Sequence, residues 1–338
     1  MPTNHAIVLD NRPEAEVSPS NFKMITAETP VLQDGQVLVK NHYLSLDPYM
    51  RGRMNAGKNY AQPQPLGEPM IGGTVGEVAE SKNAKFKVGQ TVQCMGGWQA
   101  YSLINADVPG ALKHVNAEKI SMSHYLGAVG MPGVTAWYGL NKIIQAKPGA
   151  TVTVSAASGA VGSAYGALAK ARGFRVVGIA GSKAKCDYVV NELGFDACID
   201  YKAHTDYFSL SKALRDACPN GIDGHFENVG GMVLDAVMLR ANDFSRIAVC
   251  GMIAGYNGEL LPMTNPTLIL KSRMTIEGFI VSEHMEVWPE ALAELAELIA
   301  SGKFNPRQTI AQGLASAPEA FMGLLKGHNF GKQVVKLI

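Results

Sequence analysis

One stretch near the middle of the chain constrains the fold most, because it reads as a strand, a glycine turn, a helix and a second strand in immediate succession. Thr151–Ser155 is rich in β-branched residues, which is typical of a buried parallel strand. Residues 156–162 are small and form a turn, and residues 163–172 are rich in Ala and indicate a helix. Gly173 suits the left-handed end of that helix, and Arg175–Ala180 is the next predicted strand.

This unit predicts a dinucleotide-binding site. It places a pyrophosphate at a helix N-terminus, where glycines let the backbone approach the phosphates. The turn lacks the first glycine of the usual G-x-G-x-x-G pattern, so its place between a strand and a helix carries the prediction. The alternative is a glycine-rich turn in another doubly wound protein. The turn residues predicted to contact the cofactor are Ser158, Gly159, Ala160, Val161 and Gly162.

The end of the second strand distinguishes NAD from NADP. An Asp or Glu there would bind the ribose hydroxyls and repel a 2′-phosphate. No acid stands about 20 residues after the turn, where Gly181 and Ser182 are followed by Lys183 and Lys185. Two lysines and a serine suit a dianionic phosphate, and glycine permits its close approach. The sequence therefore favours NADP(H).

Composition narrows the class of protein. At 338 residues the chain is long enough for two domains. A net charge of +1 gives no reason to expect binding to nucleic acid or to a membrane surface. No apolar run reaches the roughly 20 residues of a membrane span, and the N-terminus lacks a signal-peptide pattern. The five cysteines form no C-x-x-C pair, so we expect free thiols and a cytoplasmic enzyme.

The distribution of predicted elements divides the chain. Up to residue 126 it is strand-like with frequent Gly and Pro, as in a small closed β structure. Over residues 127–302 strands alternate with helices, which is typical of a parallel sheet covered on both faces. A last strand is predicted to return to the first domain. The predicted strands are residues 36–40, 72–78, 91–93, 151–155, 175–180, 197–200, 224–227, 246–250, 274–281 and 332–338, and a helix is predicted over residues 289–301.

Six blocks occur in an order that resembles a known family. They read Y-L-S-L-D-P-Y-M-R, G-M-P-G-V-T-A-W, A-A-S-G-A-V-G, F-E-N-V-G-G, C-G-M-I-A-G-Y-N and N-F-G-K, and they begin at residues 43, 130, 156, 226, 250 and 329. The chain thereby resembles the zinc-independent branch of the medium-chain dehydrogenase/reductase superfamily. That branch includes leukotriene B4 12-hydroxydehydrogenase/prostaglandin reductase, plant double-bond reductases and bacterial curcumin reductase. The resemblance implies a GroES-like β-rich catalytic domain over residues 1–126 and 303–338, and a Rossmann NADPH-binding domain with a doubly wound parallel sheet over residues 127–302.

Zinc ligands are missing from the positions where zinc-binding relatives carry them. Catalytic zinc needs three protein ligands drawn from Cys, His, Asp and Glu. The segment where such a relative has its first cysteine reads L-D-P-Y over residues 46–49, and the segment for Gly-His-Glu reads G-E-P-M over residues 67–70. The eight histidines form no H-x-H or H-E-x-x-H pattern. We therefore expect no metal, and alcohol oxidation assisted by zinc is disfavoured.

The resemblance implies reduction of the carbon–carbon double bond of α,β-unsaturated ketones or aldehydes. Hydride transfer to the β-carbon moves negative charge to the carbonyl oxygen, which then needs a hydrogen-bond donor. A neutral tyrosine, with a pKa of about 10, can supply that bond. Tyr256 matches the family tyrosine to which enolate stabilisation is assigned, and Tyr49 is the second candidate. The alternative for both is a half-buried aromatic residue that lines the domain interface.

Further cofactor contacts follow from matching blocks. Lys185 and Tyr201 resemble the pair that holds the 2′-phosphate, with Gly181 and Ser182 beside them. The remaining candidates are Asn228, Cys250, Met252 and Ile253 for the adenosine and ribose region, Phe279, Val281 and Asn329 for the nicotinamide region, and Pro132 and Thr135 from the second block. For Phe279 and Val281, ordinary strand packing is the alternative.

Other functions remain open at this point. Within the superfamily, the alternatives are an NADPH quinone oxidoreductase and an enoyl-thioester reductase. A third alternative is a catalytically silent NADPH-binding protein. The expected partner is a small enone or enal, with no nucleic acid and no membrane, and the resemblance implies a homodimer formed through the strand near residues 274–281.

Overall fold

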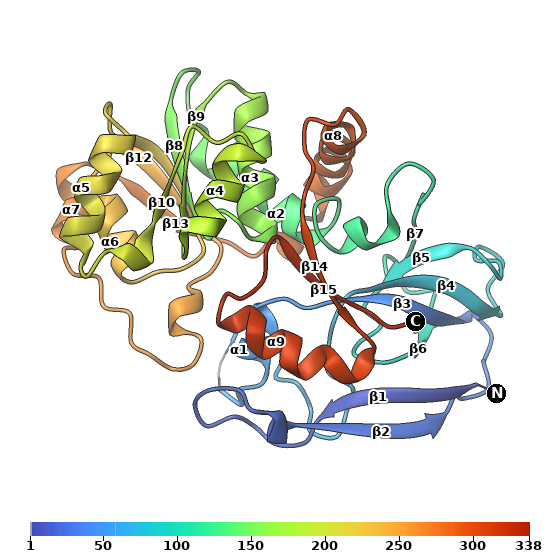
Figure 1. Cartoon of the computed structure of the whole chain (residues 1–338). Helices are drawn as coiled ribbons and strands as arrows, with labels where there is room; N and C mark the ends of the chain where they lie inside the picture. Colours follow the sequence, from blue (N-terminus) through green and yellow to red (C-terminus); the bar gives the residue numbers. More distant parts are fainter. Residues whose placement is uncertain (1, 58) are drawn as a thin grey trace. The chain divides into compact units, whose positions relative to one another are not determined.

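The computed structural model describes residues 2–57 and 59–338; Met1 and Lys58, both in the first predicted domain, lie outside the described residues. The chain divides into two compact units (Figure 1). The first comprises the chain up to Leu126 together with Gln308–Asn329 and Gln333–Ile338. The second comprises Gly127–Arg307 and Phe330–Lys332, so a short piece near the C-terminus belongs to it.

The second unit is an α/β structure. Its strands are β8 (Thr151–Ser155), β9 (Arg175–Ala180), β10 (Ala197–Asp200), β11 (Ile222–Glu227), β12 (Ala241–Val249) and β13 (Thr275–Gly278). Its helices are α2 (Met131–Tyr138), α3 (Ala160–Ala171), α4 (Lys183–Asn191), α5 (Tyr207–Ala217), α6 (Met232–Met238), α7 (Thr267–Lys271) and α8 (Trp288–Ala300).

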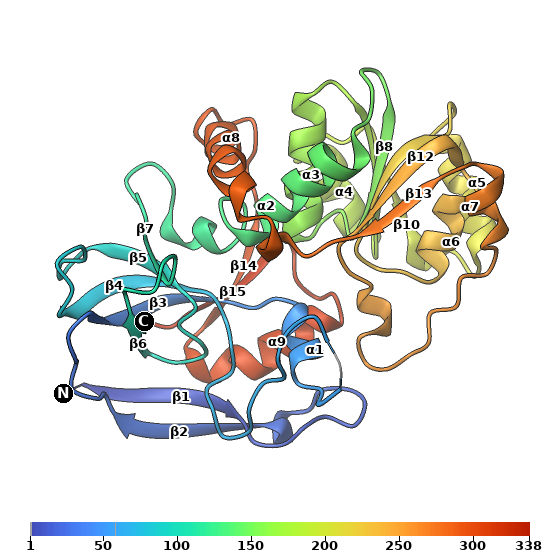
Figure 2. The same cartoon turned by 180° about the vertical axis from the view of Figure 1, so that it is seen from behind.

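These strands form one parallel sheet in the order β10-β9-β8-β11-β12-β13. The order reverses between β8 and β11, which defines a Rossmann fold and creates a crevice at the carboxyl ends of those strands. Helices α3 and α4 cover one face of the sheet, and α5 and α6 cover the other (Figures 1 and 2). The predicted doubly wound parallel sheet is confirmed.

Burial explains why the central strands were predictable. All five residues of β8 are buried, so the run of β-branched residues has apolar neighbours on both faces. On one face, Leu210 and Leu214 of α5 and Val237 of α6 pack with Ile179 and Ile199 of the sheet. The predicted strands 151–155, 175–180 and 197–200 are confirmed residue for residue.

Several predicted boundaries differ from the structure, and three elements illustrate the differences. Helix α3 begins at Ala160, three residues earlier than predicted, because Gly159 is extended and serves as its N-cap. Helix α8 begins and ends one residue earlier than predicted. Strand β13 ends at Gly278, three residues before the predicted end, so Phe279 and Val281 lie beyond it.

The first unit is β-rich, as predicted. Its strands are β1 (Thr3–Leu9), β2 (Phe22–Glu28), β3 (Gln36–Ser45), β4 (Thr74–Ser81), β5 (Thr91–Cys94), β6 (Tyr101–Asn105), β7 (Leu112–His114), β14 (Gln308–Gln312) and β15 (Lys332–Lys336), and its helices are α1 (Tyr49–Arg53) and α9 (Ala317–Leu325). A seven-stranded sheet has the order β14-β15-β3-β4-β5-β7, with β6 also paired to β3, and β1 pairs with β2.

Residues from both ends of the chain build the core of this unit. Trp98 is fully buried, stacks on Phe22 at 5.5 Å between ring centroids and meets the edge of Phe321 at 5.6 Å. Strand β15 pairs antiparallel with β3, with Val334 opposite Ser45. The predicted return of the last strand to the first domain is therefore confirmed.

Candidate functional site

The turn after β8 has the geometry of a phosphate cradle. Gly159 donates its N–H to Ala156 O at 2.9 Å, and Gly162 lies so close to the turn that an added Cβ would stand 2.4 Å from Ala156 O. Glycine is needed at position 162 because the added Cβ would clash with a backbone atom, which cannot move aside as the end of a flexible side chain can. The first N–H groups of a helix have no intrahelical partner and favour an anion, so the turn and the start of α3 suit a pyrophosphate.

A segment near the C-terminus lies against this turn. Gly331 donates its N–H to Ser158 O at 2.8 Å and pairs with Gly159 in a parallel bridge. An added Cβ at Gly331, whose φ is +62°, would stand 1.9 Å from Arg307 O. The N-F-G-K block thus contributes Gly331 to the second unit, next to the phosphate turn.

Residues from two elements form a basic corner at the end of β9. An added Cβ at Gly181 would stand 3.0 Å from Tyr201 Cε1 and 3.2 Å from Lys202 Cε. Burial and the nearby charge of Lys202 lower the pKa of Lys185. Two cations held near each other favour an anion between or beside them. We call Gly181, Ser182, Lys185, Tyr201 and Lys202 the basic corner.

The two lysines noted in the sequence have different surroundings. Lys183 lies on the surface and its Nζ bonds Asp187 at 2.6 and 2.8 Å. Lys185 lies with its Nζ 5.6 Å from the centre of the Phe330 ring. Ser182 caps α4, because its Oγ accepts the Lys185 N–H at 3.2 Å. Of the two, Lys185 therefore belongs to the basic corner and Lys183 does not.

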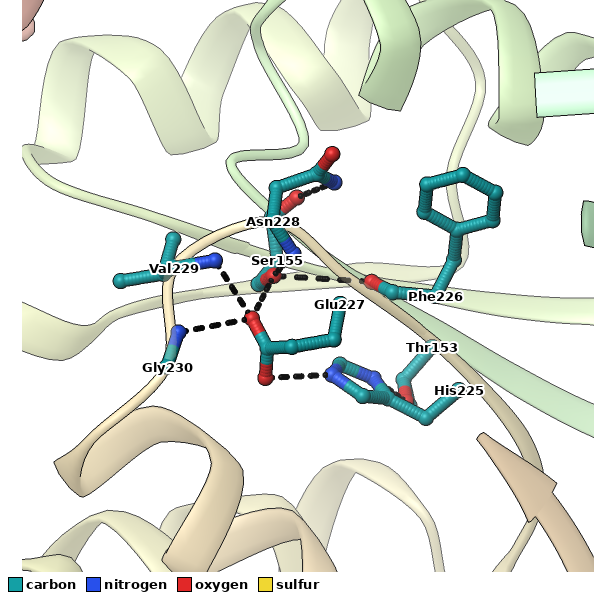
Figure 3. A network of polar contacts seen from close by, with 8 residues as sticks. All are labelled: Thr153, Ser155, His225, Phe226, Glu227, Asn228, Val229 and Gly230. Carbon is teal, nitrogen blue, oxygen red and sulfur yellow. Dashed lines mark hydrogen bonds and ion pairs between the residues drawn. The ribbon is translucent and has the colours of Figure 1, made fainter. Parts of the chain in front are cut away.

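Two loops follow β11 and β12 at the carboxyl edge of the sheet. Asn228 is held by Ser155 twice: its N–H donates to Ser155 Oγ at 2.7 Å, and its Nδ2 donates to Ser155 O at 2.8 Å (Figure 3). Ile253 donates its N–H to Asn228 O at 3.1 Å, which joins the second loop to the first. The structure therefore brings Asn228 close to Ile253 and to Met252, which directly precedes it, and their cofactor roles stay predictions.

An open cavity of about 350 Å³ lies at the ends of β12 and β13, and residues 249–252, 278–280 and 283 line it. Cys250, Met252 and Phe279 are among its lining residues. Burial raises the pKa of the Cys250 thiol to about 12, so this thiol stays protonated at neutral pH. An added Cβ at Gly251, which also lines the cavity, would stand 2.9 Å from Tyr256 Oη. The Tyr256 hydroxyl thus lies beside the cavity wall.

The residues after β13 pack differently from strand residues. The Phe279 ring stacks on Tyr138 at 5.2 Å and meets the edge of Phe226 at 6.1 Å. The Val281 carbonyl accepts the His284 N–H at 3.2 Å and the Trp288 indole N–H at 3.4 Å. Both positions therefore lie beyond the strand, and their roles at the nicotinamide stay predictions.

The other candidates are distributed over both units. Pro132 and Thr135 lie buried on α2, where Thr135 Oγ1 donates to Met131 O at 2.8 Å. Tyr49 begins α1 in the first unit, and burial and the nearby Asp47 carboxylate raise its pKa. Its hydroxyl therefore stays protonated and can donate a hydrogen bond. Asn329 is buried and also belongs to the first unit.

Two features of the site were missed in the sequence. Lys202 directly follows Tyr201, and that adjacency was the available signal. The second feature is a network of hydrogen bonds around the buried Glu227. Glu227 belongs to the F-E-N-V-G-G block, but the sequence suggested a role only for the asparagine of that block. Its partner His225 lies outside the block and carried no signal.

Neither metal ligands nor a membrane span is found in the part of the chain that the structure describes. Among residues 2–57 and 59–338, no three His, Cys, Asp or Glu side chains could jointly hold a metal ion. Within the same ranges, no helix is both long and apolar enough to cross a bilayer.

Comparison with known proteins identifies relatives along almost the whole chain. A family described as the N-terminal domain of oxidoreductase matches residues 5–111, and one described as zinc-binding dehydrogenase matches residues 160–297. NADPH-dependent curcumin reductase of Escherichia coli (strain K12) is 40% identical over 99% of this chain and 97% of its own length. The NADP(+)-dependent 2-alkenal reductase of Nicotiana tabacum is 42% identical over 94% of this chain and 92% of its own.

A solved structure agrees with these relatives. The crystal structure of CurA from Vibrio vulnificus in complex with NADPH has a TM-score of 0.92 and 42% identity, and the match covers 99% of each chain. The second family description mentions zinc, but the described residues of this chain include no group of side chains that could bind it.

Proposed function

The chain belongs to the zinc-independent branch of the medium-chain dehydrogenase/reductase superfamily, and from this premise we propose that it reduces the carbon–carbon double bond of α,β-unsaturated ketones and aldehydes with NADPH. The observation that carries the proposal is the basic corner at the end of β9. Its two lysines suit the extra phosphate of NADP, and neither Gly181 nor Ser182, which follow the strand, is acidic.

The second unit offers a surface for each part of the cofactor. The basic corner holds the 2′-phosphate, and the turn with the start of α3 holds the pyrophosphate. Asn228, Met252 and Ile253 would contact the ribose, and the cavity beside Cys250 and Phe279 suits the nicotinamide. Pro132, Thr135 and Val281 complete the proposed set in the second unit, and Asn329 of the first unit is also part of the proposal.

When bound, NADPH would supply the hydride for the β-carbon of the substrate, and a proton from water or a tyrosine hydroxyl would complete the saturated product at the α-carbon. The Tyr256 hydroxyl donates a hydrogen bond to the substrate oxygen where negative charge develops, and Tyr49 assists. A donor fixed in place before the reaction stabilises that charge more than water does, because it needs no reorganisation. No metal takes part in this mechanism.

A direct assay tests this function. Chelator-treated protein is mixed with NADPH and a panel of 2-alkenals, aryl enones and quinones, and the loss of NADPH absorbance is followed with product analysis. Rapid turnover of enones to saturated ketones is the expected result. Activity on quinones alone would identify a quinone oxidoreductase, and tight NADPH binding without any turnover would identify a silent binding protein.

Replacing Lys185 by alanine is expected to weaken NADPH at least about tenfold and to leave NADH nearly unchanged, because a charge-assisted hydrogen bond is worth about 1.5–3 kcal/mol. Dissociation constants for both nucleotides measure the effect. Lys183→Ala is the matched control on the same helix, since its Nζ bonds Asp187. Equal losses for the two nucleotides in Lys185→Ala would contradict the assignment of the 2′-phosphate.

The proposal includes a cytoplasmic homodimer. All five cysteines are free thiols in the structure, which fits a reducing compartment. Strand β13 pairs with β12 and is the last strand of the sheet, and Thr275, Glu277 and Gly278 are exposed on it. Such an edge can pair with the same edge of a second copy. Light scattering of the purified protein measures the oligomeric state.

A further inference from the structure

A carboxylate lies fully buried at the point where β11 ends. Glu227 is 0% exposed, and its two oxygens have different partners (Figure 3). Oε1 accepts the Ser155 hydroxyl at 2.5 Å and the N–H groups of Val229 and Gly230 at 2.6 and 3.1 Å. Oε2 lies 3.1 Å from His225 Nε2. All of these partners therefore lie close to Glu227 near the carboxyl ends of β8 and β11.

The contacts around Glu227 keep it ionised. Burial by itself raises the pKa of a carboxyl group, but the hydrogen bond and charge of His225 together with the bonds from Ser155 and Val229 outweigh it, so the pKa of Glu227 lies below its ordinary value. Thr153 Oγ1 lies 2.7 Å from His225 Nδ1, so the imidazole is held from both sides. Stability alone does not account for this buried charge, because apolar residues of similar volume often stabilise a folded protein equally well.

The carboxylate determines the conformation of the first loop. Its Oε1 atom accepts the N–H groups of two successive loop residues, Val229 and Gly230, so both groups point toward the interior. Ser155 connects this bond to Asn228, since its Oγ donates to Glu227 and accepts from Asn228 N–H. The Asn228 Oδ1 atom faces away from the network, on the side opposite Glu227 (Figure 3). The Asn228 backbone is thus held through Glu227 and the Ser155 hydroxyl, and its side chain, proposed to contact the ribose, is oriented by the Ser155 carbonyl.

The second loop depends on the first. Asn228 O and Val229 O accept the N–H groups of Ile253 and Ala254, each at 3.1 Å. Tyr256 lies two residues after Ala254 in the same loop, and its N–H donates to Ile253 O at 3.2 Å. An unbroken series of hydrogen bonds therefore leads from the Glu227 carboxylate to the loop that carries the proposed donor to the substrate.

We propose that Glu227, supported by Ser155 and His225, is a positioning residue that holds both loops in the conformation needed for NADPH binding and for the placement of Tyr256. The inference rests on the proposed function, because that function gives Asn228 and Tyr256 their roles. Glu227 acts only through these loops and touches neither the substrate nor the cofactor.

The same strand offers a matched control at its other end. Asp223 accepts the Thr151 N–H at 2.9 Å and the Asn242 amide at 2.8 Å, so it joins β8, β11 and the start of β12 at the edge away from both loops. Asp223 and Glu227 are thus acidic residues of one strand that bond the same neighbouring strand. Removal of either costs stability, but only Glu227 is expected to affect the site.

The test compares Glu227→Ala, Glu227→Gln and Asp223→Ala. Hydrogen exchange measures the protection of the amides in residues 228–231 and 250–256, and fluorescence titration measures NADPH affinity. In Glu227→Ala we expect lost protection in both loops and NADPH binding weaker by about tenfold or more, since bonds to a charged acceptor are lost. Glu227→Gln keeps an acceptor oxygen toward the loop, so partial recovery is expected. Asp223→Ala is expected to keep wild-type protection and affinity.

Steady-state kinetics adds a readout that general destabilisation would not produce. In Glu227→Gln, KM for NADPH is expected to rise and kcat to fall, whereas Asp223→Ala should alter thermal stability alone. Where Glu227→Ala does not fold, Ser155→Ala takes its place, because it removes the hydroxyl that joins Glu227 to Asn228.

Unchanged loop protection and NADPH affinity in the Glu227 and Ser155 variants would overturn the inference. Equal changes in the Asp223 control would overturn it as well. Hydrogen exchange requires no substrate, so failure of the inference is distinct from failure of the proposed function, which would appear as wild-type protein without enone turnover.

Discussion

Replacing Gly162 by alanine is expected to weaken NADPH binding on the order of 100-fold, because each lost hydrogen bond to a charged phosphate costs about 1.5–3 kcal/mol. The added Cβ would stand 2.4 Å from Ala156 O and 2.8 Å from Ala157 Cα. Both are backbone atoms of the turn, so the clash is relieved only when the turn and the start of α3 separate. The N–H groups that cradle the pyrophosphate then no longer converge. Titration of the variant with NADPH measures the loss.

A control on the same helix separates binding from stability. An added Cβ at Gly166 would stand 1.9 Å from the Phe195 ring, so Gly166→Ala disturbs packing one turn further from the phosphate. We expect Gly166→Ala to lower the thermal midpoint while the folded protein keeps its NADPH affinity. If Gly162→Ala bound NADPH as tightly as the wild type, the turn would not be the pyrophosphate site.

The parallel sheet could be predicted because burial and sequence agree there. Every residue of β8 is buried, and the strand is flanked by glycine-containing turns, so its run of β-branched residues has a clear start and end. Strand β13 lies at the edge of the sheet and is mostly exposed, so burial does not delimit it and its predicted end was three residues too late. Edge strands make fewer contacts, and the sequence pattern is correspondingly weaker.

Side-chain partners could not be predicted from the same pattern. The sequence indicated two lysines after β9, but only the structure shows that Lys183 pairs with Asp187 one helical turn away. Lys202 joins the basic corner because β10 lies beside β9 in the sheet, and sheet neighbours are not evident from sequence spacing. The network of Glu227 and His225 could not be predicted for the same reason. Ser155, which bonds Glu227, and Thr153, which bonds His225, lie on β8, roughly seventy residues away in sequence but adjacent in the sheet.

Replacing Tyr256 by phenylalanine is expected to lower kcat for enone reduction by about 100- to 1000-fold, the usual effect of removing one donor to a developing oxyanion. The change removes only the hydroxyl, which lies beside Gly251 at the cavity wall. NADPH affinity should stay close to the wild-type value, because the ring and the loop remain. Single-turnover measurements at saturating NADPH and enone isolate the chemical step.

Two further tyrosines make this prediction specific. Tyr125 donates its hydroxyl to Asn116 O at 2.6 Å in the first unit, so Tyr125→Phe loses a hydrogen bond without touching the proposed site and should keep wild-type kcat. Tyr49→Phe is expected to have a smaller effect than Tyr256→Phe, since Tyr49 is the assisting donor. If Tyr49→Phe were the more damaging change, the two roles would be exchanged, and if neither change lowered kcat, the developing charge would be stabilised by a group other than these hydroxyls.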